Sequence, residues 1–273
     1  FGDNGRGFLE DFYQADIANL TSAFIGGIIF NFANLLLVIA IEIAGMAIAF
    51  PIGIGIALVL GVFTNYISQP EGNPYVLFSG VTLIAIAILF DGLAYNKTLK
   101  NTKDNPLKGI FISLIAGIAM GFFYKFVASS MSVDFLIPQA GKLTPYTALV
   151  VFSIGIFVSN FMFNTINMYF PLKGEKVSFV DYLKLGSLKL HMIGIFGGII
   201  WGVGMSLNIL ASDQAGPAIA YGLGQGATLV AAIWGVFIWK EFKDLPYESR
   251  WLIPMMFILF FSGIGFIIAA KLI

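Results

Sequence analysis

The sequence predicts an all-α, polytopic membrane protein built as an inverted-repeat helical bundle. Three observations predict it: a composition poor in charge, a series of long apolar stretches, and an internal repeat. Hydrophobic residues make up 58% of the 273 positions and charged residues only 11%. Ordinary soluble domains carry about 25% charged residues. The chain therefore has too few charges to cover the surface of a soluble protein of this size.

Eight stretches are long enough to cross a bilayer, whose hydrocarbon core needs roughly 20 consecutive apolar residues. They lie near 18–41, 44–66, 76–95, 107–129, 146–170, 190–211, 215–239 and 251–272. Pro51 lies inside the second span and is followed by Gly53 and Gly55, so we expect a kink or local unwinding there. The mixed segment 178–191 is typical of a helix lying at the membrane interface.

The positive charges orient the spans. Of the 15 Lys and Arg residues, 11 fall in three alternate connections, at 96–108, 171–189 and 240–250. Cytoplasmic connections carry the excess of positive charge in membrane proteins. We therefore expect a multi-pass protein of the plasma (inner) membrane with these three connections in the cytoplasm and both ends of the chain outside.

A shift of 171 residues aligns Ser22–Val59 with Ile193–Val230 without a gap, giving 15 identities in 38 positions. The first span thus matches the sixth, and a step of five spans reverses the direction across the membrane. Inverted repeats are typical of secondary transporters. We expect an N-terminal repeat at 1–96 with three spans, a cytoplasmic connection at 97–106 and a C-terminal repeat at 107–273 with five spans. On this reading eight of ten spans are present, two helices precede Phe1, and an open flank lies beside the first span.

The residue types exclude most other chemistry. The net charge is zero, which argues against a nucleic-acid partner. The absence of Cys and the single His leave no catalytic set and no metal site, and nothing indicates a cofactor. A secondary transporter is therefore the leading hypothesis, and a channel or a structural membrane subunit is the alternative from another class.

Two motifs carry a family resemblance. The second span contains Ala49-Phe50-Pro51-Ile52-Gly53-Ile54-Gly55, and the seventh contains Tyr221-Gly222-Leu223-Gly224-Gln225-Gly226-Ala227-Thr228 followed by Trp239-Lys240-Glu241-Phe242. With the repeat, they resemble the drug/metabolite transporter superfamily. Within it, the chain is most similar to the bacterial glucose/ribose-porter group, which is related to rhamnose porters and plant ureide permeases. The resemblance implies ten helices, a central cavity lined by the first four helices of each half, and termini outside.

Polar and aromatic side chains within the spans are the candidates for substrate binding. Amides at positions i, i+4 and i+7 of the fifth span share one helical face, and aromatic rings can stack on a planar or sugar-like solute. The alternatives are helix–helix hydrogen bonds and packing. The candidate residues are Asn31, Asn34, Phe50, Asn160, Asn164, Asn167, Trp201, Met205, Asn208, Tyr221 and Gln225. Gln225 is the strongest single candidate. Its repeat counterpart is the apolar Ile54, so the polar group is present in one copy only, as an asymmetric substrate would require.

The middle of the spans holds neutral hydrogen-bonding groups, whereas ionisable residues lie within about two turns of a span end. An unpaired charge in the membrane is costly, so we expect a neutral polar substrate. A monosaccharide is the first choice, a ureide or nucleobase the second, and a multidrug or metabolite exporter a further alternative. Lys125, near the outer end of the fourth span, is the main threat to this expectation, because it either extends toward the interface or faces the cavity mouth. The expected partners are the small-molecule substrate, the lipid bilayer and a coupling proton or sodium ion.

Overall fold

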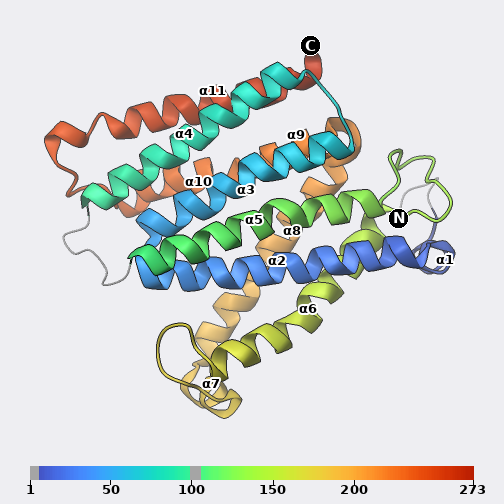
Figure 1. Ribbon diagram of the computed structural model, residues 1–273, viewed down its shortest axis with the longest axis horizontal. Helices are drawn as coiled ribbons and strands as arrows, with labels where there is room; N and C mark the ends of the chain where they lie inside the picture. The colour runs from blue at the N-terminus through green and yellow to red at the C-terminus, as the bar shows by residue number, and fades with distance from the viewer. Residues whose placement is uncertain (1–5, 99–105) are drawn as a thin grey trace.

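The computed structural model describes residues 6–98 and 106–273, and these are almost all helical (Figure 1). Their only β-type pairing is an isolated bridge between Met131 and Leu143. Lys100 and Lys103, which belong to the positively charged connection at 96–108, lie outside the described residues. The helices are α1 (Phe8–Gln14), α2 (Ile17–Ala44), α3 (Met46–Ser68), α4 (Pro74–Thr98), α5 (Pro106–Ser130), α6 (Pro145–Tyr169), α7 (Phe179–Leu185), α8 (Leu188–Ala215), α9 (Pro217–Gly224), α10 (Ala227–Ile233), a π-helix (Trp234–Trp239), a 3-10 turn (Tyr247–Ser249) and α11 (Leu252–Leu272).

Eight helical segments are long and apolar enough to cross a membrane, which confirms the predicted spans. Helix α2 packs against α5 and α6, while α3 packs against α5, α4 and α9. Helices α4 and α11 run side by side along one edge of the bundle (Figure 1). Gly80 and Gly263 allow that pair to approach closely, because a Cβ on either would lie under 3.0 Å from the backbone of the other helix.

The helix bounds repeat in the register that the sequence predicts. Adding 171 to the bounds of α1 and α2 gives the bounds of α7 and α8, and adding it to the bounds of α3 gives 217–239, the whole seventh span. Helices α2 and α8 both end at a glycine with positive φ, which is Gly45 at 89° after α2 and Gly216 at 82° after α8. Helices α1 and α7 lie at opposite ends of the bundle (Figure 1), as inverted copies require.

The seventh span is interrupted where its counterpart α3 is continuous. Between α9 and α10, the N–H of Gly226 donates to the carbonyl of Leu223 at 2.8 Å, an i−3 bond in place of the usual i−4 bond. Three glycines within five residues weaken the helix here. The unwinding predicted around Pro51 is wrong, because α3 runs through it. Pro51 lies near the start of α3. The N–H that proline lacks would have donated only to a carbonyl of the first turn, so the rest of the helix keeps its hydrogen bonds.

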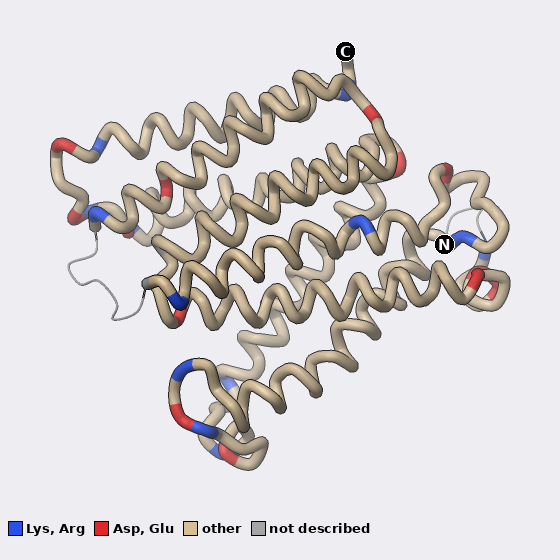
Figure 2. Tube along the Cα trace, viewed as in Figure 1, with Lys and Arg blue, Asp and Glu red and all other residues tan. Residues whose placement is uncertain are grey.

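Most charged residues lie toward the two ends of the bundle (Figure 2). The end that holds α1 and the C-terminus is here called the α1 end, and the opposite end, which holds α7 and the connection that leads into α11, is called the α7 end. At the α1 end, Asp11 is fully buried. Its Oδ2 accepts hydrogen bonds from the N–H and Oγ1 of Thr144, at 2.8 and 2.9 Å, and its Oδ1 lies 3.0 Å from Nε of Arg6. Thr144 is the residue at which α6 begins. Asp11 therefore caps α6 from a distant segment.

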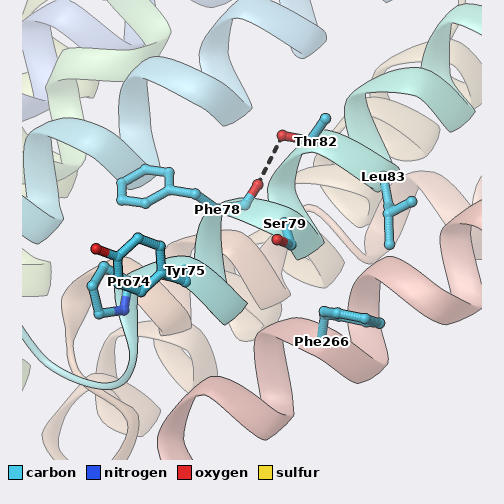
Figure 3. A pocket seen from close by; sticks show the side chains of 7 residues that line it. All are labelled: Pro74, Tyr75, Phe78, Ser79, Thr82, Leu83 and Phe266. Carbon is cyan, nitrogen blue, oxygen red and sulfur yellow. Dashed lines mark hydrogen bonds between the residues drawn. The ribbon is translucent and has the colours of Figure 1, made fainter.

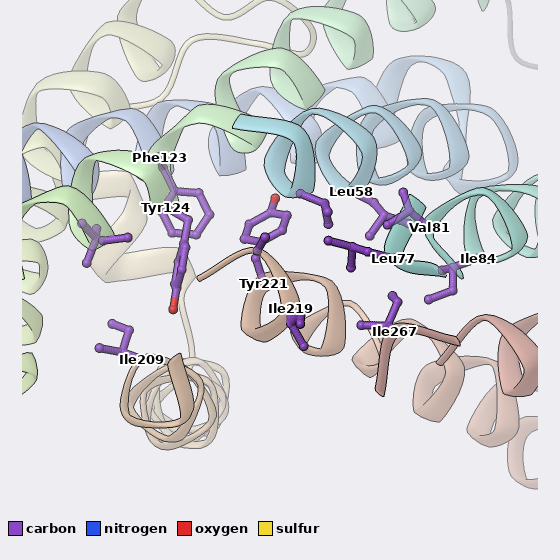
Figure 4. Close-up of a cluster of buried hydrophobic side chains, with 14 of the residues drawn as sticks. Leu58, Leu77, Val81, Ile84, Phe123, Tyr124, Ile209, Ile219, Tyr221 and Ile267 are labelled. Carbon is purple, nitrogen blue, oxygen red and sulfur yellow. The ribbon is translucent and has the colours of Figure 1, made fainter. Parts of the chain in front are cut away.

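The main hydrophobic core lies between α3, α4, α5, α9 and α11 (Figure 4). Leu58, Leu77 and Ile84 are fully buried in it, and Tyr221 enters it from α9. This core joins the N-terminal helices to the C-terminal ones, so the two halves share one packed interior.

Candidate functional site

The predicted amides of α2 and α6 mostly form contacts within or between these two helices. Asn31 is buried, and its Nδ2 donates to Oγ of Ser159 at 3.0 Å, which ties α2 to α6. On α6, Nδ2 of Asn164 donates to Oδ1 of Asn160 at 2.7 Å along the predicted face. Asn34 and Asn160 are exposed and Asn167 is half-buried. The structure therefore does not gather these amides around one cavity.

The predicted residues of α8 and α9 lie closer together. Nδ2 of Asn208 donates to the carbonyl of Ala220 at 2.7 Å and so holds α8 to α9. The ring of Trp201 stacks on that of Phe30, with centroids 4.8 Å apart and planes at 24°. Three further candidates, Phe50, Met205 and Gln225, are half-buried.

Tyr221 is a core residue that joins the two halves. It is 3% exposed, and its hydroxyl lies within hydrogen-bond distance of the carbonyls of Ala57 on α3 and Met120 on α5, at 3.1 and 3.3 Å. Its ring fills the space beside Gly61 and lies 5.6 Å from that of Tyr124. In this conformation the ring is packed on protein, so it is not available to stack on a solute.

A cavity of about 200 Å³ lies at the α1 end of the bundle, where α3, α5 and α9 meet. Its wall exposes more apolar than polar surface, although most of the residues that form it carry polar side chains: Asn65, Ser68, Gln69, Ala128, Ser129, Lys142 and Pro217. Lys142 is engaged already, since its Nζ donates to Oδ1 of Asn19 at 3.1 Å and to the carbonyl of Ser129 at 2.5 Å. The cavity is thus a small compartment of mixed polarity between helices of both halves.

Asn65 is the unusual member of this wall. It is only 1% exposed, and its Nδ2 donates to the carbonyl of Gly61 at 2.7 Å. Its Oδ1 is buried and accepts no hydrogen bond from the described residues. The sequence analysis missed Asn65 and Gln69. The available signal was their i, i+4 spacing, which places two carboxamides on one face at the end of a span.

A larger groove of about 720 Å³ lies between α4 and α11 and is mainly apolar (Figure 3). The hydroxyl-bearing residues Ser79 and Thr82 also line it, and Oγ1 of Thr82 donates to the carbonyl of Phe78 at 2.8 Å. Tyr75, at one end of the groove, is 84% exposed. An open apolar groove of this kind suits a lipid chain better than a polar solute. Within the described ranges, no group of three His, Asp or Glu residues is placed to hold a metal ion.

A family model described as "Ureide permease" matches residues 89–270. The chain belongs to the ureide permease family. Ureide permease 1 of Arabidopsis thaliana is 23% identical over 326 residues, covering 99% of this chain and 83% of the relative. Ureide permeases 4 and 2 of the same plant are 22% and 23% identical, and each alignment covers 97% of this chain and 81% of the relative.

Family membership establishes a multi-pass membrane transporter of a small molecule, since the relatives are named as permeases and not as enzymes. It also refines the resemblance drawn from the sequence motifs. The comparisons support the ureide permease branch and not the glucose/ribose-porter group that the motifs suggested.

Proposed function

We propose that this ureide permease family member carries a small neutral ureide across the membrane by alternating access. The names of the relatives support a ureide over the monosaccharide that the sequence motifs favoured. The neutral character of the substrate follows from the spans themselves, whose interiors carry amides and aromatic rings and few charges. A neutral solute leaves no buried charge to be compensated.

The unpaired Oδ1 of Asn65 carries the proposal. A buried acceptor without a donor costs roughly 1–3 kcal/mol, so the cavity wall favours a solute that brings an N–H group. A ureide presents N–H groups beside carbonyl oxygens, and a carboxamide offers the complementary acceptor and donors. Because Asn65 forms part of the wall, a modest rotation of its side chain would turn Oδ1 toward a solute. Gln69, the C-cap residue of α3, offers a second carboxamide.

The position of the cavity suits alternating access. Asn65 belongs to the N-terminal repeat, whereas Ser129 and Pro217 belong to the C-terminal one. Inverted-repeat transporters place the substrate at the interface between repeats and often use interrupted helices there. The break between α9 and α10 supplies such an interruption near Gln225. Movement of α9 relative to α3 and α5 would then open or close the cavity.

We further propose that the cavity faces the outside. The Lys-rich connections 171–189 and 240–250 lie at the α7 end, and positive connections are cytoplasmic by the positive-inside rule. The cavity lies at the α1 end, beside Lys142. On this orientation the described conformation has the Asn65 cavity on the external side of the membrane.

The test is solute uptake by full-length protein in proteoliposomes, with hydantoin as the cyclic ureide, uracil, glucose and a carboxylate of similar size. Saturable uptake of hydantoin, inhibited by neutral ureides and not by the carboxylate, is expected. Asn65→Ala should weaken ureide binding about 5- to 150-fold, the equivalent of roughly 1–3 kcal/mol. Imposed proton and sodium gradients, compared in the same vesicles, test the expected coupling ion.

Asn96→Ala is the matched control, because Asn96 is an exposed amide of α4 that does not line the cavity. It should leave ureide affinity unchanged. Uptake of glucose with no competition by ureides would restore the monosaccharide hypothesis. Equal effects of the two substitutions would show that the Asn65 cavity is not the binding site, and unsaturable conductance would indicate a channel.

A further inference from the structure

Three helices present rows of residues toward one common axis that leads from the Asn65 cavity into the bundle. Each row has the i, i+4, i+8 spacing that places residues on one helical face. Helix α9 runs opposite to α3 and α5, so the three rows form matching layers. From the cavity toward the α7 end, the rows are Asn65, Gly61 and Ala57 on α3, Ala128, Tyr124 and Met120 on α5, and Pro217, Tyr221 and Gln225 on α9 and its C-cap.

The side chain of Tyr221 closes the middle of this axis. Its ring is buried, and a Cβ on Gly61 would overlap it. The ring of Tyr124 lies beside it, with centroids 5.6 Å apart (Figure 4). The hydroxyl reaches one layer deeper and lies 3.1 and 3.3 Å from the carbonyls of Ala57 and Met120. A solute in the cavity therefore meets a closed floor about one helical turn down.

Helix α9 has the form of a short unit that can change direction at both ends. It spans the eight residues Pro217–Gly224. It follows Gly216, whose φ is 82°, and it ends where the N–H of Gly226 donates to the carbonyl of Leu223. Positive φ and an i−3 hydrogen bond both depart from α-helical geometry, and such points at the ends of elements serve as hinges. Rotation about these two points would carry Tyr221 off the axis.

We propose that Tyr221 is the gate between the Asn65 cavity and the interior of the bundle, and that its hydroxyl holds the gate closed. The inference rests on the proposed function, because a gate acts only in a transport cycle. Packing alone does not account for the hydroxyl, since phenylalanine would fill the core without burying a polar group. The repeat counterpart of Tyr221 is Phe50, which lacks the hydroxyl. A neutral hydrogen bond shifts an equilibrium by only about 2- to 12-fold, which is weak enough to break in every cycle.

The test measures how often the floor opens, by thiol labelling of the full-length polypeptide in proteoliposomes without any solute. The 273 residues contain no Cys, so an introduced thiol is the only one among them. Ala57→Cys places the reporter at a fully buried position beneath Tyr221. A small charged methanethiosulfonate reaches this thiol only when the ring has moved away. Tyr221→Phe should raise its labelling rate about 2- to 12-fold, because the closed form loses one hydrogen bond.

Two controls separate a gate from a residue that only stabilises the fold. Tyr66→Phe is the matched substitution, because it removes a hydroxyl of α3 that donates to the carbonyl of Gly72 at 3.4 Å, outside the three rows. It should leave the labelling of Ala57→Cys unchanged. Ala87→Cys is the second reporter, at a fully buried position on α4, and Tyr221→Phe should leave its labelling unchanged. Equal acceleration at both reporters, or no acceleration at Ala57→Cys, would overturn the gate.

Hydantoin uptake by the unmodified protein distinguishes this inference from the proposed function. Faster labelling of Ala57→Cys in the Tyr221→Phe background, with no uptake of any ureide, supports the gate and refutes the ureide substrate. Saturable hydantoin uptake, with equal labelling in the two backgrounds, refutes the gate and leaves the proposed function standing.

Discussion

Replacing Asp11 should destabilise the α1 end of the bundle more than any change at an exposed acidic residue. Asp11 is fully buried, accepts two hydrogen bonds from Thr144 and pairs with Arg6. Hydrogen bonds to a charged group contribute about 1.5–3 kcal/mol each, against about 0.5–1.5 for neutral ones. Asp11→Asn keeps an acceptor for Thr144 but loses the charge at two bonds, so we expect a loss of about 2–3 kcal/mol. Asp11→Ala removes the ion-pair partner of Arg6 and the acceptor of the Thr144 N–H, and should cost about 3–5 kcal/mol.

The assay is reversible unfolding in mixed detergent micelles, with the free energy of unfolding compared between variants. Glu10→Ala is the control, since its side chain is exposed on the same helix. It should change stability by less than about 0.5 kcal/mol. If Asp11→Ala and Glu10→Ala are equally mild, α1 does not cap α6 in the folded protein, and the reasoning from burial fails.

Three further predictions test the fold, two by substitution and one by a change of pH. Gly61→Ala should destabilise by about 1–3 kcal/mol, because its Cβ would overlap the buried ring of Tyr221; unfolding no easier than in wild type would disprove that packing. The pKa of Asp181 lies below its ordinary value because the side chain and backbone N–H of Ser178 donate to the carboxylate. This contribution to α7 is therefore present above the unfolded pKa of about 3.9 and is lost as the pH falls through the lowered folded pKa. Faster amide exchange in α7 on acidification checks it, and an unchanged rate contradicts it. Lys271→Gln removes a partly exposed ion pair and should change stability by no more than about 1 kcal/mol, less at high salt.

The sequence predicted the eight spans because the length and hydropathy of a membrane helix are set by the bilayer, a property local to each segment. It also predicted the repeat register, which the helix bounds follow from α1 and α7 through α3 and the seventh span. It did not predict the interruption near Gln225 and the continuity at Pro51. Both depend on where a breaking residue falls within its helix, and hydropathy does not record that.

The partners of individual polar groups were decided by the tertiary structure. An asparagine within a span must find a hydrogen bond, but its own helix does not specify which neighbour supplies it. Asn31 donates a hydrogen bond to Ser159. Asn65 and Gln69, which the sequence analysis missed, instead line a cavity where α3, α5 and α9 meet. The bilayer and the periodicity of the helix determine which segments cross the membrane. Which faces meet is decided only when close packing brings distant segments together, because that choice depends on side chains far apart in the chain.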